Sequence, residues 1–116
     1  MRRNRDKFIF DMLDSCRFLL DLTANQTVAR YKSDRVFRGA VERELQIIGE
    51  AMLQLKTLSP ETAAGFTEHR RIIGFRHVLV HGYYVLDPDL VWLIIEEKLP
   101  ILRGELEAML GPIEET

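Results

Sequence analysis

The sequence predicts an all-α protein, an up-and-down bundle of four main helices with short helices between them. Apolar residues recur at helical spacing in the long segments, and the connections between these segments are short. No segment alternates apolar and polar residues as a strand would. The 116 residues are enough for one domain, 1–116, with a modest core.

The first half of the chain contains two long helical patterns. The first helix is predicted over residues 5–22, and residues 25–31 predict a short helix or a turn. Ser33 or Asp34 is the expected N-cap of the second long helix, which ends near Leu58. The first apolar stripe consists of Phe8, Ile9, Met12, Leu13, Cys16, Leu19 and Leu20. The second consists of Phe37, Val41, Leu45, Ile48, Met52 and Leu55.

The residues around Pro60 predict the start of the next helix. Ser59, Pro60 and Glu61 supply a cap, a proline at the first helical position and an acid favoured by the helix dipole. A short helix therefore begins here and is expected to stop near Gly65. A third main helix is predicted from about residue 67 to residue 80 or 82.

The fourth main helix is predicted to begin with Asp87 as its cap and Pro88 as its first residue. Pro100 should kink or break it, because proline lacks the amide hydrogen that a helix uses. Its apolar residues are Val91, Ile94, Ile95, Leu99, Leu102, Leu106 and Met109.

Several apolar residues lie off the main stripes, among them Phe18, Phe75, Val85 and Trp92. One bundle core cannot easily hold them all. Because an exposed apolar patch often marks a partner surface, we expect a two-fold symmetric homodimer. The alternative is that these residues are scattered singly over the surface, which is common.

Composition narrows the class of protein. The formal net charge is −2, from 16 basic and 18 acidic side chains, so a polyanion such as RNA would have to meet a local basic patch. The single cysteine excludes an internal disulfide and fits a reducing compartment, so we expect a cytoplasmic location. No apolar run is long enough to span a membrane, and the basic N-terminal stretch is followed by no signal-peptide core.

Residues 76–84, RHVLVHGYY, gather an arginine, two histidines and two tyrosines. His77 and His81 are four apart and share a helix face, whereas Arg76 and His81 are five apart and point away from each other. Either the helix ends before His81, or the cooperating arginine and histidine belong to different chains. Gly82 would permit an early stop, because glycine readily takes the left-handed cap conformation. The two tyrosines then lie on the turn.

These groups suit metal-free cleavage of RNA. Histidine exchanges protons near neutral pH, and the arginine fork matches phosphate oxygens. Attack by a ribose 2′-hydroxyl needs a proton acceptor, a proton donor and a cation for the phosphorus centre. His77 and His81 also have the spacing of zinc ligands, but the HEXXH pattern requires glutamate where this chain has Val78, so no metal site is predicted.

The motif R-x-x-x-x-H-x-Y, formed by Arg76, His81 and Tyr83, resembles the signature of HepT-type proteins of the HEPN superfamily. The flanks I-I-G-F-R and D-P-D-L-V-W, the stretch A-V-E-R-E-L-Q-I-I-G-E-A over residues 40–51, and L-P at residues 99–100 are similar too. The resemblance covers nearly the whole chain and implies a HEPN-like helical fold.

The resemblance also implies a function. HepT-like proteins are homodimeric ribonuclease toxins of type VII toxin–antitoxin modules, and Arg76 and His81 would be the catalytic pair. Their antitoxin, an MntA-type minimal nucleotidyltransferase, would transfer AMP from ATP to the motif tyrosine, Tyr83. No cofactor is implied for this chain, because the partner enzyme uses the ATP. The expected partners are a second copy, the antitoxin and RNA.

Other residues are candidates for supporting roles. His77 stands where the family commonly has asparagine, and it could hydrogen-bond in the same way, carry a second proton or retune His81. Glu50 either orients a motif side chain or is a solvated helix residue. A basic cluster for RNA phosphates is predicted at His69, Arg70 and Arg71. The alternative function is a non-catalytic, substrate-presenting or binding partner of a nucleotidyltransferase.

Overall fold

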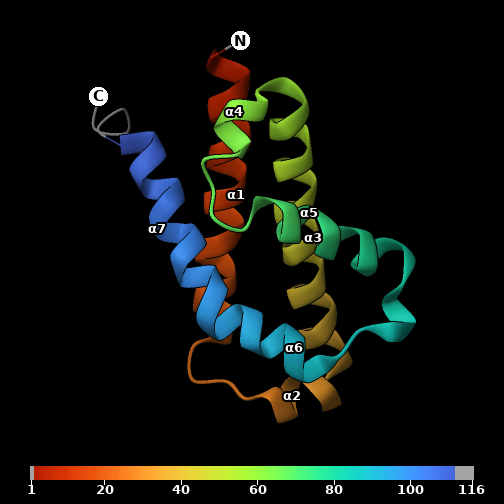
Figure 1. The fold of residues 1–116 in the computed structure, drawn as a ribbon. Helices are drawn as coiled ribbons and strands as arrows, with labels where there is room; N and C mark the ends of the chain where they lie inside the picture. The colour runs from red at the N-terminus through yellow and green to blue at the C-terminus, as the bar shows by residue number, and fades with distance from the viewer. Residues whose placement is uncertain (1, 112–116) are drawn as a thin grey trace.

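The computed structural model describes residues 2–111, except for the side chains of residues 2, 3 and 83. Every regular element in this part of the chain is helical, which confirms the predicted all-α class (Figure 1). The elements are α1 Arg2–Thr23, α2 Val28–Ser33, α3 Arg35–Leu58, α4 Pro60–Ala63, α5 His69–His81, the 3₁₀ turn η1 Tyr83–Val85, α6 Pro88–Leu93, the π turn η2 Ile94–Lys98 and α7 Leu99–Leu110.

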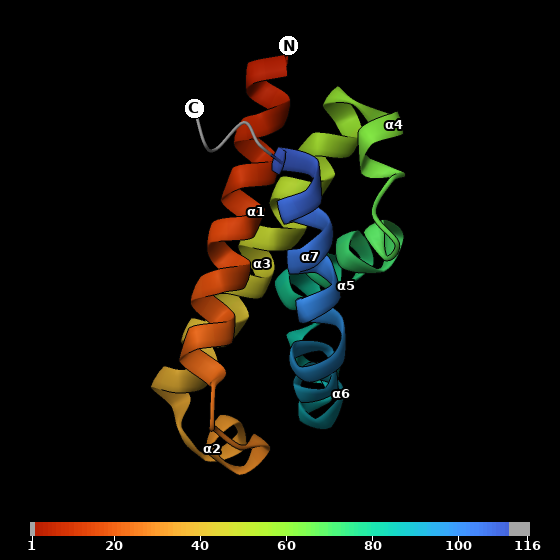
Figure 2. The ribbon, with the colours of Figure 1, turned by 90° about the vertical axis from the view of Figure 1, so that its left-hand side faces the viewer.

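Two long helices, α1 and α3, form the centre of the molecule. In Figure 1 the helices α7, α1, α3 and α5 follow one another across the view in that order. The packing has the same order, since α7 contacts α1, α1 contacts α3, and α3 contacts α5. Figure 2 shows that α2 and α6 lie at one end of the molecule and α4 at the other. None of the helices in residues 2–111 is both long and apolar enough to cross a membrane.

Capping side chains set several helix starts as the sequence predicts. Asp34 caps α3, accepting hydrogen bonds at 3.1 Å from the amides of Val36 and Phe37. The hydrogen bond from the Phe37 amide is the main reason why the Asp34 pKa lies below its ordinary value. Asp87 caps α6, and Pro88 is its first residue. Ser59 precedes α4 as expected, but its hydroxyl bonds to side chains of the first turn and not to a backbone amide.

The predicted interruption at Pro100 takes the form of a π turn. The amide of Leu99 donates to the carbonyl of Ile94, five residues earlier, where an α-helix would use the residue four earlier. Proline has no amide hydrogen to continue the regular pattern. The fourth helix therefore stays helical but is divided into α6, η2 and α7.

The core lies between α1, α3 and the divided fourth helix. Both predicted stripes of the first half lie mainly inside it, and the single cysteine, Cys16, is fully buried. Burial raises the pKa of its thiol to about 12. The buried apolar residues are Ile9, Met12, Leu13, Cys16, Leu19, Tyr31, Phe37, Val41, Leu45, Ile48, Ala51, Met52, Leu55, Ala63, Phe66, Val91, Trp92, Ile95, Leu99, Leu102, Leu106 and Leu110.

One of the expected surface residues is in fact buried. Trp92 is only 7% exposed, with its ring centroid 6.1 Å from that of Tyr31 and 6.2 Å from that of Phe37. The expectation was wrong because Trp92, although off the main stripe of the fourth helix, is covered by Tyr31 of α2, which packs against α6, and by Phe37 of α3. Phe75 is partly buried against the core, and Phe18 and Val85 are exposed.

Replacing the buried tryptophan tests this corner. Trp92→Ala should lower the free energy of unfolding by about 3–5 kcal/mol, because it removes a large buried ring and leaves a cavity. Urea denaturation followed by circular dichroism measures the change. Phe10→Ala on α1, which removes a ring that is 54% exposed, is the matched control and should cost less than about 1 kcal/mol. Equal losses in the two variants would contradict the assignment.

Candidate functional site

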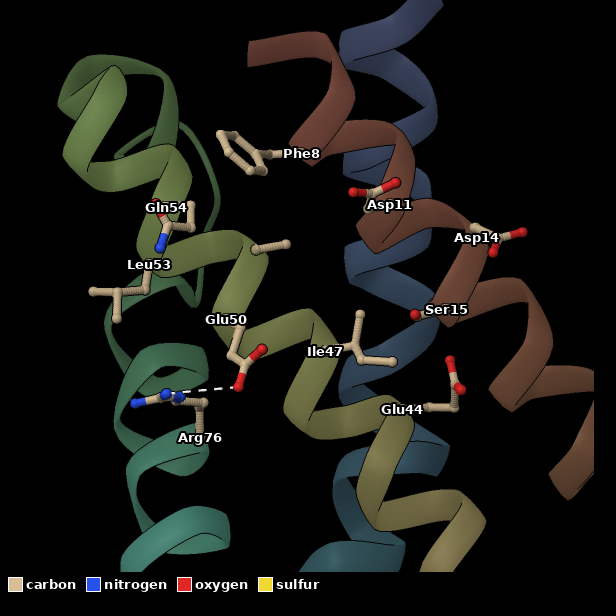
Figure 3. A pocket seen from close by; sticks show the side chains of 11 residues that line it. Phe8, Asp11, Asp14, Ser15, Glu44, Ile47, Glu50, Leu53, Gln54 and Arg76 are labelled. Atoms are coloured by element: carbon tan, nitrogen blue, oxygen red, sulfur yellow. Dashed lines mark ion pairs between the residues drawn. The ribbon is translucent and has the colours of Figure 1, made fainter. Parts of the chain in front are cut away.

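Arg76 lies near the middle of α5, on the side that faces α3 (Figure 3). Its Nη2 atom is 3.6 Å from Oε1 of Glu50. This distance is longer than a hydrogen bond, so the contact is an ion pair. Gln46, one turn earlier on α3, donates from Nε2 to the same Glu50 oxygen at 3.2 Å. Glu50 thus lies beside the motif arginine, while its side chain is still 41% exposed.

Most hydrogen-bonding capacity of the Arg76 guanidinium is not used by Glu50. A guanidinium has five N–H donors in a fixed plane, and the ion pair engages one of its nitrogens. The Nε atom is buried, and within the described part of the chain it has no hydrogen-bond partner. A buried donor without a partner is unfavourable, but Nε is shielded from solvent, so an anionic ligand would meet the rest of the guanidinium, on a side chain that is 25% exposed.

His81 is exposed at the C-terminal end of the same helix. Its ring centroid is 4.9 Å from that of His77, also exposed, so the two imidazoles lie side by side as their spacing predicts. α5 continues through His81, which excludes the alternative that the helix ends before it. Gly82 follows with φ −130° and ψ 33°, so the expected left-handed cap is not formed. Its amide donates to the Val78 carbonyl within the helical pattern.

Arg76 and His81 therefore leave α5 in different directions. Five residues turn an ideal helix by about 500°, which sets the two side chains roughly 140° apart. Arg76 faces α3 and Glu50, whereas His81 is on the solvent side with His77. Within one chain the structure does not bring the predicted catalytic pair together.

The residues of the predicted basic cluster, 69–71, differ in their surroundings. His69 is half-buried, and its Nδ1 atom lies 3.3 Å from the Phe66 carbonyl. Arg71 is exposed and pairs with Glu68 at 3.5 Å. Consecutive helical residues diverge by about 100°, so neighbours in sequence need not share a face.

One arginine and two histidines form a different stripe on the outer side of α5. Arg70, His77 and His81 are seven and four residues apart, which keeps each within about 40° of the next around the helix. All three side chains are exposed. This stripe joins one of the predicted RNA-binding residues to the two motif histidines.

Sequence reasoning missed an acidic hollow beside Arg76. The hollow has a volume of about 460 Å³ and lies between α1, α3 and α5 (Figure 3). Four carboxylates line it, two from α1 and two from α3, and Arg76 stands at its edge. These acidic residues are Asp11, Asp14, Glu44 and Glu50. The signal in the sequence was the pair of aspartates spaced by three on α1, opposite a helix with its own outward glutamates.

The carboxylates of the hollow do not converge on one point. Within residues 2–111 no three histidine, cysteine, aspartate or glutamate side chains are placed so that they could hold a metal ion together. The hollow thus presents spread negative charge, which disfavours phosphate on this side of Arg76.

The motif tyrosine lies just beyond α5. Residues Tyr83–Val85 form the 3₁₀ turn η1, so both tyrosines are outside the helix as predicted. The Val85 amide donates to the Gly82 carbonyl at 3.0 Å and closes this turn. The Tyr83 side chain is outside the described part of the structure. The Tyr84 side chain is 79% exposed.

Comparisons with known proteins bear on the whole chain. The sequence model of a family described as HepT-like, "Ribonuclease HepT-like", matches residues 12–109. A protein of Methanocaldococcus jannaschii named "Putative RNase MJ1380" is 28% identical over 106 residues, which cover 91% of this chain and 96% of the relative. A protein of Thermococcus cleftensis named "Probable ribonuclease HepT" is 26% identical over 113 residues, covering 94% and 98%. No solved structure matches the chain significantly.

Proposed function

Because the chain belongs to the HepT-like ribonuclease family, we propose that it is a metal-independent endoribonuclease, the toxin of a type VII toxin–antitoxin module acting in the cytoplasm. The observation that carries the proposal is the state of Arg76. Its side chain is 25% exposed and its Nη2 atom is 3.6 Å from Glu50, beyond hydrogen-bond distance, on the helix that also carries His81. Such a cation is suited to the phosphate of a substrate.

The chemistry needs the two motif residues in different roles. A His81 imidazole takes the proton of the ribose 2′-hydroxyl, whose oxygen then attacks the adjacent phosphorus. The 5′-oxygen leaves with a proton from a second imidazole, and a 2′,3′-cyclic phosphate remains. Arg76 stabilises the extra negative charge on the phosphorane oxygens in between. Glu50 holds Arg76 in place, and His77 supports His81.

The site is completed by a second copy of the chain. The roughly 140° between Arg76 and His81 on α5 supports this, because the two groups of one chain cannot face the same phosphate. Exposed apolar surface supports it as well. A groove of about 450 Å³ between α5 and the divided fourth helix is lined mainly by apolar residues, and α5 has no fully buried side chain.

The antitoxin would act on Tyr83. The phenol oxygen attacks the α-phosphorus of ATP, pyrophosphate leaves, and a base of the nucleotidyltransferase accepts the phenol proton. The added phosphate and adenine then occupy the space beside His81 that RNA needs. The position of residue 83 in a turn directly after α5 supports this, since a turn gives a partner enzyme access to the backbone there.

One observation favours the alternative function of a non-catalytic partner. Arg76 is already paired with Glu50, and the hollow beside it is acidic. In that case the motif would serve only to present Tyr83 to the nucleotidyltransferase. Cleavage of RNA by the purified chain separates the two functions.

We predict that the purified protein cleaves a defined RNA, and that the rate is the same with and without EDTA. His81→Ala should slow this reaction about a hundredfold or more, because it removes a proton-transfer group. Arg76→Ala should also be impaired. Arg17→Ala, which removes a surface arginine paired with Glu107, is the matched control and should cleave normally. A wild-type rate for His81→Ala, or loss of wild-type cleavage in EDTA, would sink the proposal.

The second prediction concerns mixed dimers. Arg76→Ala and His81→Ala chains, each strongly impaired alone, should recover roughly a quarter of wild-type activity when refolded together, because half of the dimers are mixed and each has one intact pair. Cleavage assays at matched total concentration measure this. Activity that stays at background in verified mixed dimers, or full activity of a wild-type monomer, would rule out the composite site.

The third prediction concerns Tyr83. Incubation with ATP and the partner nucleotidyltransferase should add AMP to the wild-type chain and to Tyr84→Phe, and cleavage should fall as the modified fraction rises. Tyr83→Phe should fold, cleave RNA and gain no AMP, because it lacks the attacking oxygen. Intact mass spectrometry measures the modification. If Tyr83→Phe still gains the mass of AMP, the modified residue is another one.

A further inference from the structure

Gly49 lies where α5 crosses α3. A Cβ atom built at this position would be 2.2 Å from Cβ of Arg76, 2.8 Å from its Cγ and 3.3 Å from its Cα. Carbon atoms that are not bonded pack at about 3.5–4.0 Å, so no side chain fits between the two helices here. The first side-chain carbons of Arg76 thus pack directly against the backbone of α3.

Other glycines within residues 2–111 do not have this environment. Gly39, also on α3, and Gly74, on α5, would each place a Cβ in open space. Gly65 would meet the flexible end of Met109 at 3.0 Å. A helix interior disfavours glycine relative to alanine, so a glycine in the middle of α3 is accounted for by the close approach of Arg76.

Two neighbours of Gly49 act on the other end of the same arginine. Glu50 pairs with the guanidinium at 3.6 Å, and Gln46 holds the Glu50 carboxylate by a hydrogen bond of 3.2 Å. One turn of α3 therefore fixes the positions of both the Cβ atom and the guanidinium of Arg76. The Nε atom of Arg76 is buried and unpartnered.

We propose that Gly49 and Gln46 are positioning residues for the cleavage reaction. Gly49 fixes the Cα–Cβ end of Arg76, and Gln46 fixes its guanidinium through Glu50. The inference rests on the proposed function in requiring that Arg76 act on the phosphate. Stabilisation of a transition state depends on the position of the cation to within a fraction of an ångström, whereas loose binding of RNA does not. Displacement of Arg76 should therefore lower kcat and leave KM nearly unchanged.

Gly49→Ala is the direct test, with Gly39→Ala as the matched control on the same helix. The added methyl must push α5 away from α3, so kcat should fall about tenfold to a hundredfold, the effect expected for a displacement near 1 Å. Gly39→Ala should keep the wild-type kcat and KM. A wild-type kcat for folded Gly49→Ala, or an equal loss in Gly39→Ala, would overturn the inference.

An Arg76→Ala background separates positioning from general damage. If Gly49 acts through the arginine, Gly49→Ala should cause no further loss of residual activity in Arg76→Ala. The conflict with the added methyl persists in this background, because the Arg76→Ala variant keeps the Cβ atom at that position. A second tenfold loss would show that the substitution harms the site by another route and would overturn the inference.

Gln46→Ala covers the case in which Gly49→Ala does not fold, since it adds no atoms. It should lower kcat about threefold to tenfold at unchanged KM, the size expected for one lost hydrogen bond. Wild-type kinetics for Gln46→Ala would remove Gln46 from the proposal, and with an unfolded Gly49→Ala would overturn it.

The Nε–H signal of Arg76 tests the geometry without any cleavage. Its proton should exchange slowly with water in the wild type, because the atom is buried, and at least about tenfold faster in Gly49→Ala. The signal is assigned by its loss in Arg76→Lys. If the wild-type protein did not cleave RNA, the proposed function would be contradicted. The exchange measurement would still decide whether Gly49 fixes the position of Arg76. Equal exchange in both chains would overturn the positioning role.

Discussion

The close contact between α5 and α3 is the constraint on which the rest of the site depends. α5 has no fully buried side chain, and among the helices of residues 2–111 it packs mainly against α3, which therefore largely sets its position. That contact is close only because residue 49 lacks a Cβ atom. α3 therefore serves two purposes. Its buried stripe faces the core, and one turn of its other side supports Arg76.

The charges around α5 divide the site into two sides of opposite sign. The outer stripe consists of Arg70, His77 and His81, whereas the hollow beside Arg76 is lined by four carboxylates. With a net charge of −2, the chain as a whole offers RNA no attraction, so these local fields decide the approach. In the proposed function, RNA would lie along the outer face of α5 and reach Arg76 at its edge and not through the hollow.

Helix-by-helix features were the most predictable from sequence, because they depend on near neighbours in the chain. The cap at Asp34, the start at Asp87 and Pro88, and the interruption before Pro100 all follow from local hydrogen bonding. The burial of Trp92, the acidic hollow and the crossing at Gly49 each need two elements to be placed in space. Periodicity describes one helix face at a time and contains no crossing angle, so these features could not be read from it.

The same distinction explains how one helix can carry both site residues without forming a site. Arg76 and His81 are five residues apart in the sequence. Because α5 continues through His81, this spacing makes the two side chains point in different directions. Phe75 and Val78 of α5 also line an apolar groove that the chain leaves open. In the proposed homodimer, the second copy would cover apolar surface and bring its own histidine to the arginine in one step. The arginine and the histidine of one chain leave α5 roughly 140° apart, so the proposed activity would depend on assembly with a second copy.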